Sequence, residues 1–233
     1  MRPLPRYLVL ATRNAHKVGE IQAILGPAFE CVDLNRFPGV PAVVEDAPTF
    51  AGNATKKAVE LARWLAGSSL LPERRATWVL ADDSGLEVDA LNGAPGVHSA
   101  RFAALDAAGA PAGNSKDADN NAKLLRLLAN VPAERRTGRF RCVLALAPVP
   151  DAAARVASPA CAADEIELGV RIFDGACEGR IALEPRGHGG FGYDPLFVPV
   201  GYDQTFGELG ESVKNGLSHR AQALEKLVES LNR

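Results

Sequence analysis

Short apolar runs alternate with stretches of helical periodicity from the first residues onward. Residues 7–11 form an apolar run that predicts a buried strand, and residues 12–17 form a polar loop after it. Across 18–25 the apolar residues recur at helical spacing, and Gly26 and Pro27 predict the end of that helix. Strand, loop and helix together predict the first unit of an α/β fold, in which ligands bind at the carboxyl ends of strands.

The same criteria predict the remaining elements, which combine into a mixed sheet with helices. They are a helix over about 49–66, a strand over 77–81 that ends at Asp82, a helix around 124–128, a strand over 141–149, a pair of strands within 169–183 and a helix over about 218–231. The helix over 49–66 has one apolar face, made of Ala54, Ala58, Leu61, Ala62 and Leu65. Residues 150–165 are small and alanine-rich, which predicts an exposed loop insertion.

The amino-acid composition is that of an ordinary globular protein, and it argues against some classes of binding partner. The chain has 233 residues, 47% of them hydrophobic, and a formal net charge of −2, so no basic excess points to nucleic acid or to an anionic membrane. The apolar run near the N-terminus is too short for a signal peptide or a membrane span. We therefore expect a cytoplasmic protein with neither a nucleic-acid nor a membrane partner. Its cysteines lie far apart and form no CxxC motif, at Cys31, Cys142, Cys161 and Cys177.

Two adjacent carboxylates, Asp82 and Asp83, follow the predicted strand over 77–81 and precede Ser84 and Gly85. Carboxylates beside a buried strand are costly unless a cation or hydrogen-bond donors satisfy them. Oxygen ligands of this kind suit Mg²⁺, and a further carboxylate can activate an attacking water. The alternative interpretation is a simple turn, since Asp, Ser and Gly are common turn formers.

The polar loop over residues 12–17 could receive phosphate groups. It offers a hydroxyl, an amide, a lysine and the backbone amides of a helix N-terminus, all of which suit a triphosphate. It lacks the glycines of a Walker loop. The alternative is a solvated helix start, capped by Thr12 or Asn14.

Residues 187–192 match the GxGxxG pattern letter for letter. A dinucleotide fingerprint must open a helix, whereas Pro195 and the strand-like run 196–199 follow here, so we reject a dinucleotide site. A glycine loop that carries Phe191 and Tyr193 suits a base pocket instead, because an aromatic ring can stack on a purine.

A polar group opens the last predicted helix. Ser218 is a plausible N-cap, and His219 and Arg220 would fall in the first turn, where an anion or a base carbonyl is favoured. Lys214 lies shortly before them. The alternative is a capped helix with surface charges.

Taken in order, these motifs resemble one family over roughly residues 7–232. They are Thr12-x-Asn14-x-x-Lys17, Asp82-Asp83-Ser84-Gly85-Leu86, the run from Gly93 to Arg101, the run from Gly189 to Pro195, and Ser218-His219-Arg220. The sequence is similar to the inosine/xanthosine triphosphate pyrophosphatases. The resemblance implies one pyrophosphatase domain over residues 1–233, an α/β fold with a long mixed β-sheet flanked by helices, and two lobes around a central nucleotide cleft. It also implies a homodimer.

The resemblance further implies an activity and a site. The reaction is hydrolysis of ITP, dITP and XTP to the monophosphate and pyrophosphate with Mg²⁺, which cleans the nucleotide pool. Asp83 would bind the metal with Glu45 and accept a proton. The remaining positions would contact the nucleotide: Thr12, Arg13, Asn14, Ala15, His16 and Lys17 at the triphosphate; Asn53 and Lys57 near the phosphates; Ser84 and Arg101 at a part of the substrate that is not specified; Phe191, Gly192, Tyr193 and Asp194 around the base; and Lys214, His219 and Arg220 at its 6-oxo edge.

Two departures from the family pattern leave alternatives open. Gly52 stands where members often carry an acidic residue, and the usual glycine is missing after Glu45 and Asp46, so either of these two could be the second metal ligand. Three other functions also remain: a non-catalytic nucleotide-binding module, a pyrophosphatase for other modified nucleotides, and an NAD-linked oxidoreductase, which rests only on the GxGxxG match.

Overall fold

The computed structural model describes residues 6–71, 76–106, 113–150 and 169–232. The predicted insertion over 150–165 therefore lies outside the described residues, apart from its first position. In chain order the main elements are β1 (Arg6–Leu10), α1 (Ala15–Leu25), β2 (Phe29–Asp33), α2 (Phe50–Ala66), β3 (Thr77–Val88), α3 (Asp117–Leu127), β4 (Thr137–Pro148), β5 (Arg171–Ile181), β6 (Phe197–Pro199), α5 (Glu211–Leu217) and α6 (His219–Asn232). Short 3₁₀ segments join several of them, including Gly96–Arg101 and Ala103–Asp106.

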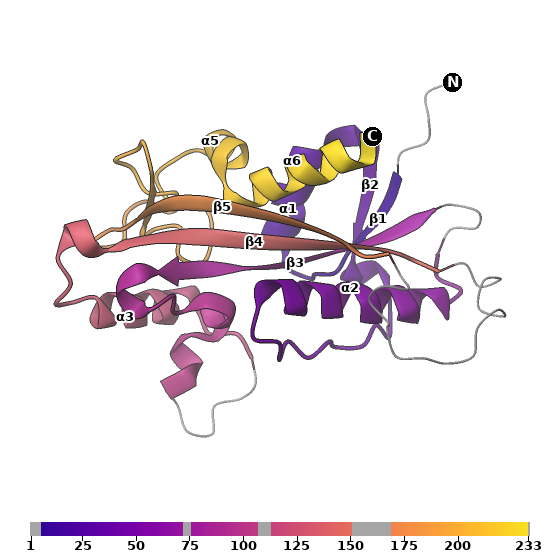
Figure 1. The fold of residues 1–233 in the computed structure, drawn as a ribbon, viewed down its shortest axis with the longest axis horizontal. Helices are drawn as coiled ribbons and strands as arrows, with labels where there is room; N and C mark the ends of the chain where they lie inside the picture. Colours follow the sequence, from indigo (N-terminus) through magenta and orange to yellow (C-terminus); the bar gives the residue numbers. More distant parts are fainter. Residues whose placement is uncertain (1–5, 72–75, 107–112, 151–168, 233) are drawn as a thin grey trace. The chain divides into compact units, whose positions relative to one another are not determined.

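The described strands form a six-stranded sheet in the order β2-β1-β3-β4-β5-β6. Strand β1 pairs in parallel with both β2 and β3, with Leu8 opposite Cys31 on one side and Trp78 on the other. Strand β5 pairs antiparallel with β6, with Gly179 opposite Pro199. The predicted α/β fold with a mixed sheet flanked by helices is thus confirmed (Figure 1).

The chain forms two compact units. The first contains the described residues up to Asp83, those from Val143 to Asp174 and those from Ala223 onward, and the second contains the rest. Strand β3 passes from the first unit to the second between Asp83 and Ser84.

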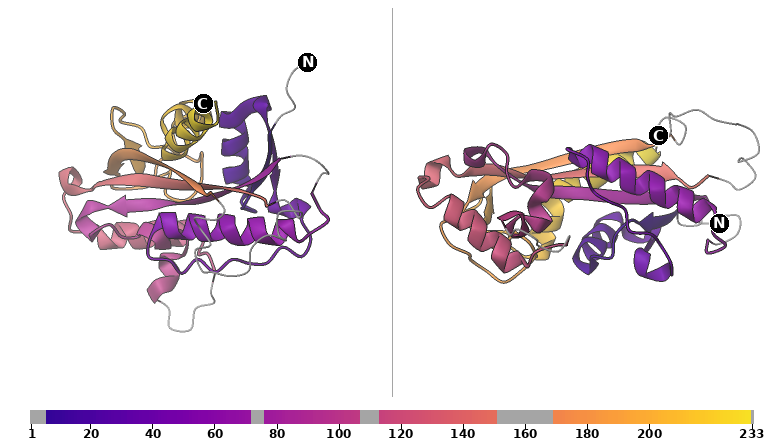
Figure 2. Two further views of the ribbon diagram at one scale, coloured as in Figure 1. Left: turned by 45° about the vertical axis from the view of Figure 1, so that its right-hand side comes forward. Right: turned by 90° about the horizontal axis from the view of Figure 1, so that it is seen from below.

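In the first unit, helices cover both faces of the sheet. Figures 1 and 2 show α2 on one face and α6 on the other. The central strands are accordingly apolar on both sides, and Val9, Leu10 and Val79 have no exposed surface. The apolar face predicted for α2 is confirmed, because all five of its named residues are buried.

In the second unit, a cluster of aromatic and aliphatic side chains forms the core. The Phe140 ring lies 4.6 Å from that of Phe197, and the Phe197 ring lies 5.3 Å from that of Phe206, measured between centroids. Leu124 of helix α3 and Leu128, the C-cap residue of that helix, pack into this cluster together with Tyr193. Burial of these large rings ties α3 and the segment before β6 to the sheet.

Two predicted elements were wrong, and two others, strand β2 and helix α5, were missed. Strand β3 does not end at Asp82 but runs through residues 82–85 to Val88, because side chains from elsewhere satisfy both carboxylates. Residues 171–181 form one strand rather than two, and its Gly179 leaves room for β6, since a Cβ there would lie 2.4 Å from the Val198 oxygen. Helix α5 is short and shows little apolar periodicity, so the sequence did not reveal it.

Within the described residues, no helix is long and apolar enough to cross a membrane.

Leu124→Ala tests the core of the second unit against a matched change on the same helix. Leu124 is fully buried, whereas Leu127 is 46% exposed. We expect Leu124→Ala to lower the free energy of unfolding by about 2–5 kcal/mol, because it leaves a cavity. Leu127→Ala should change it by less than about 0.5 kcal/mol. Urea unfolding followed by circular dichroism measures both, and equal losses would contradict the assigned packing of α3.

Candidate active site

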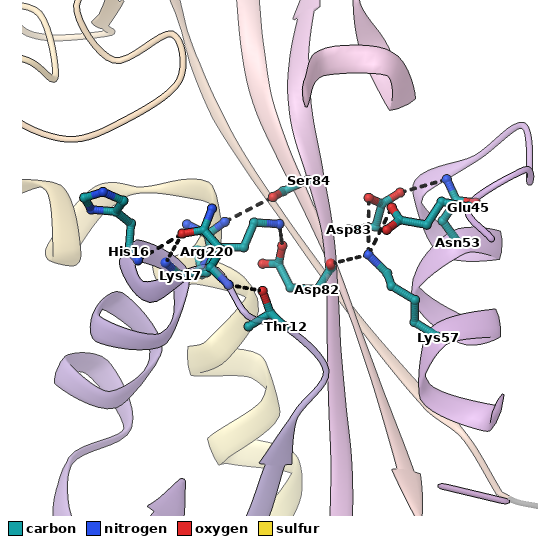
Figure 3. A network of polar contacts seen from close by, with 11 residues as sticks. Thr12, His16, Lys17, Glu45, Asn53, Lys57, Asp82, Asp83, Ser84 and Arg220 are labelled. Carbon is teal, nitrogen blue, oxygen red and sulfur yellow. Dashed lines mark hydrogen bonds and ion pairs between the residues drawn. The ribbon is translucent and has the colours of Figure 1, made fainter. Parts of the chain in front are cut away.

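Strand β3 presents three consecutive polar side chains to opposite sides of the sheet. Side chains alternate along a strand, so Asp82 and Ser84 point one way and Asp83 the other. Figure 3 shows Asp82 facing Lys17, and Asp83 facing Lys57 and Asn53. Asp82 and Asp83 are both buried, with 4% and 6% of their surfaces exposed. The contacts with these partners therefore offset the free-energy cost of burying two carboxylates.

The surroundings of Asp83 come from helix α2 and the segment before it. Asn53 and Lys57 are four residues apart and share one face of the helix. The Asn53 amide donates to the Asp83 carboxylate at 3.1 Å and accepts from the Ala47 backbone at 2.9 Å. The Lys57 ammonium lies 3.7 Å from the Asp83 carboxylate and 3.2 Å from that of Glu45, and it donates to the Asp82 carbonyl at 2.8 Å. One cation thus lies against two carboxylates.

The two candidates for the second carboxylate differ in their partners. Glu45 shares Lys57 with Asp83. Asp46 instead binds Lys56 at 2.7 Å, and its side chain is 66% exposed. The hydrogen bond from Lys56 lowers the pKa of Asp46, as expected for an exposed pair. The geometry therefore places Glu45, and not Asp46, beside Asp83.

Burial raises the pKa of Asp83 above its ordinary value. The positive charge of Lys57, the hydrogen bond from Asn53 and the charge of Lys17 oppose this rise, and the nearby charge of Glu45 adds to it. A carboxylate whose pKa is raised by burial is a stronger base than one in water.

The polar loop after β1 opens helix α1, and its cap is Asn14. The Asn14 side-chain oxygen accepts from the backbone amides of His16 and Lys17, at 2.9 and 3.3 Å. The Thr12 hydroxyl oxygen in turn accepts from the Asn14 amide at 3.1 Å. Capping therefore accounts for both polar side chains, as the alternative interpretation predicted, while Lys17 reaches the Asp82 carboxylate. Arg13, Ala15 and His16 are exposed around this helix start.

In the second unit, residues 189–195, hereafter the base loop, carry Phe191 close to two cations. The Lys214 ammonium lies 4.7 Å from the centroid of the Phe191 ring, and the Arg220 guanidinium carbon lies 5.9 Å from it. Arg220 also donates to the Ser84 hydroxyl at 3.1 Å. Lys214 is buried and binds the Asp194 carboxylate at 2.6 Å. The glycine run opens no helix and leads into β6, as the rejection of a dinucleotide site predicted.

Other predicted site residues take structural positions. Tyr193 is buried in the core, where its hydroxyl donates to the Ser99 carbonyl at 2.9 Å and burial raises its pKa. His219 stacks on Phe140 with ring centroids 4.9 Å apart. Ser218 accepts from the Ala221 amide at 3.2 Å, which confirms it as a helix cap. Arg101 is half-buried at the end of a 3₁₀ segment, and Gly192 lies in the base loop.

Three residues that hold these parts in place were not among the predicted site residues, namely Ser99, Asp117 and Asn121. The Ser99 hydroxyl accepts from the Leu86 amide at 2.9 Å and donates to the Gly96 carbonyl at 2.6 Å. Asp117 and Asn121 of α3 both bind the backbone of Gly192. The four-residue spacing of Asp117 and Asn121 is a helical signal, but it lies in a polar stretch that hides it.

Glu45 and Asp83 could hold a divalent metal ion. Mg²⁺ in nucleotide enzymes takes one or two carboxylates and fills its remaining positions with water and phosphate oxygens. Both carboxylates also contact the Lys57 ammonium, at 3.2 Å for Glu45 and 3.7 Å for Asp83. In the described part of the chain, no group of three or more His, Cys, Asp and Glu side chains could hold a metal alone.

Comparison with known proteins identifies the protein family to which this chain belongs. The Ham1 family matches residues 8–230. A dITP/XTP pyrophosphatase of Desulforamulus reducens is 48% identical over 97% of this chain and 96% of its own length, and one of Opitutus terrae is 44% identical over 95% and 97%. The structure of a HAM1 protein from Coxiella burnetii is 36% identical, covers 97% of this chain and 98% of its own, and has a TM-score of 0.72. The chain therefore belongs to the Ham1 family.

The buried pair of Lys214 and Asp194 provides a test of the base loop. Lys214→Met leaves the Asp194 carboxylate buried beside an apolar side chain, so we expect a loss of about 3–5 kcal/mol in the free energy of unfolding. The matched control is Lys226→Met, because the side chains of Lys226 and its partner Asp174 are 53% and 60% exposed. That change should cost about 0–1 kcal/mol. Urea titration compares the two, and a negligible loss for Lys214→Met would contradict the buried pair.

Proposed function

We propose that this chain hydrolyses non-standard purine nucleoside triphosphates, namely ITP, dITP and XTP, to the monophosphate and pyrophosphate. The observation that carries the proposal is the arrangement of Glu45 and Asp83 around Lys57. It occurs in a chain that matches dITP/XTP pyrophosphatases over nearly its whole length, which supports both the reaction and the purine substrates. We also propose that residues 1–233 act as a single pyrophosphatase domain.

Mg²⁺ is the proposed cofactor, and Glu45 and Asp83 would hold it. When bound, the ion would neutralise charge on the phosphate oxygens and lower the pKa of water. The hard oxygen donors of the two carboxylates support this choice over a softer metal.

The triphosphate would be held by the positive charges beside strand β3. Lys17 and Lys57 each already contact a carboxylate of that strand, so both ammonium groups have a fixed position before any substrate binds. Fixed donors stabilise the charge that develops on the leaving pyrophosphate without having to reorganise. Arg13 and His16, exposed at the start of α1, would add further donors.

Asp83 would accept a proton from the attacking water. The water oxygen forms a bond to the α-phosphorus, and the bond from that phosphorus to the bridging oxygen breaks as pyrophosphate leaves. Asn53 holds one of the Asp83 oxygens in a fixed direction, which supports its role as the base. The non-catalytic alternative would need no such base.

The purine ring would stack on Phe191, with Lys214, His219 and Arg220 nearest its edge. Hypoxanthine and xanthine carry a carbonyl at position 6, where adenine carries an amine. Lys214 and Arg220 are hydrogen-bond donors placed around the Phe191 ring, which favours a carbonyl and disfavours an amine. The cytoplasmic location, the homodimer and the lack of a nucleic-acid partner stay predictions.

Asp83→Asn tests the catalytic assignment. The amide keeps the shape of the side chain but cannot accept the proton, so we expect turnover of ITP to fall on the order of 10²–10⁴-fold. Asp46→Asn is the matched control, because Asp46 is exposed and binds Lys56. It should keep turnover within about twofold, since surface pairs contribute little.

Pyrophosphate release from ITP measures each variant. Near-normal turnover in Asp83→Asn would remove Asp83 from the mechanism. Glu45→Gln, measured beside Asp46→Asn, decides which of the two acidic residues assists Asp83. A larger loss in Asp46→Asn would reverse our choice.

A further inference from the structure

Helix α3 holds the base loop through both polar backbone groups of one residue. The Asp117 carboxylate accepts from the Gly192 amide at 2.6 Å. The Asn121 side chain donates to the Gly192 carbonyl at 3.0 Å. Asp117 and Asn121 are four residues apart, so the same face of α3 carries both contacts.

The loop that these contacts hold is tightly folded around Asp194. The Asp194 carboxylate accepts from the Phe191 amide at 2.8 Å and binds Lys214. A Cβ at Gly190 would lie 2.0 Å from that carboxylate, so only glycine fits there. Gly192 has a φ of 63°, a left-handed conformation that glycine adopts without strain. Because Gly192 directly follows Phe191, its attachment to α3 restricts the backbone that carries the Phe191 ring.

Helix α3 is a suitable platform because it is anchored independently of the loop. Asn120 accepts from the Ala103 amide at 2.8 Å and donates to the Ala100 carbonyl at 3.3 Å. Lys123 is buried and donates to the Phe102 carbonyl at 2.7 Å. Neither contact involves the base loop, so α3 keeps its place when the contacts to Gly192 change.

We propose that Asp117 and Asn121 are positioning residues for purine selectivity. They hold Phe191 at the distance from Lys214 and Arg220 at which a stacked purine presents its 6-position to those donors. This inference rests on the proposed function. Neither residue needs to touch the substrate, because each acts through the backbone of Gly192.

Discrimination between a carbonyl and an amine depends on where the donors meet the base. If the Phe191 ring shifts, the stacked purine shifts with it. A donor is then no longer aligned with the 6-carbonyl of a favoured base, and it no longer faces the 6-amine of adenine, so binding of adenine is no longer disfavoured. Displacements of about 1 Å in a positioned group can change rates by up to about 10²-fold. A loosened base loop should therefore reduce selectivity more than it reduces the chemical step, which Asp83 carries in the first unit.

The test compares Asp117→Ala with Asp119→Ala. Both aspartates lie in the first turn of α3, so both changes remove the same charge from the same helix end. We expect Asp117→Ala to lower the ratio of kcat/KM for ITP to that for ATP by about tenfold, mainly through KM for ITP. Asp119→Ala should keep the ratio. Asp117→Asn retains a hydrogen-bond acceptor and should restore most of it.

A second readout does not depend on activity. Amide hydrogen exchange at Gly192 should be faster in Asp117→Ala than in the parent protein, and unchanged in Asp119→Ala. If the parent protein releases no pyrophosphate, the proposed function fails, while the exchange measurement still decides whether α3 holds the loop. Should Asp117→Ala fail to fold, Asn121→Ala carries the same test.

Two results would overturn the inference. In the first, the parent protein is active, but the ratio of kcat/KM for ITP to that for ATP falls equally in Asp117→Ala and Asp119→Ala, or falls in neither variant. The second is a loss in Asp117→Asn as large as that in Asp117→Ala, because the charge of the residue, and not its contact with Gly192, would then be responsible.

Discussion

The arrangement of the first unit depends on placing two carboxylates inside a strand. Asp82 and Asp83 are both buried in the middle of β3, where an unpaired charge would cost several kcal/mol. Alternation along the strand sends them to opposite sides, so each needs its own partner. Lys17 comes from α1, and Lys57 and Asn53 come from α2. The same contacts that make the strand stable thus fix the two ammonium groups and the proposed base.

In the second unit, the main structural requirement is to hold the glycine-rich base loop in one conformation. Glycines allow the tight turn but add backbone freedom that must be lost on folding. Contacts from three segments restrict it: Asp117 and Asn121 bind Gly192, the Tyr193 hydroxyl binds Ser99, and Lys214 binds Asp194. These contacts leave Phe191 with its ring beside Lys214 and Arg220.

The sequence predicted what depends on local pattern. The apolar face of α2, the strand after the N-terminus and the cap at Ser218 each follow from neighbouring residues, and the motifs with their order indicated the family. What it could not predict depends on partners far along the chain. Strand β3 continues through Asp82 because Lys17, 65 residues away, reaches it. Tyr193 turns into the core to meet Ser99, 94 residues away, and Gly192 binds Asp117, 75 residues away. No local pattern contains these pairs.

Pyrophosphate release by the unaltered chain tests the proposed reaction, its metal and its selectivity together. ITP, dITP, XTP, GTP and ATP would each be supplied with Mg²⁺ and, separately, with excess EDTA. We expect fast release from ITP, dITP and XTP, slow release from GTP and ATP, and loss of release with EDTA. Release of single phosphate, or binding of ITP with no pyrophosphate formed, would contradict the proposed reaction.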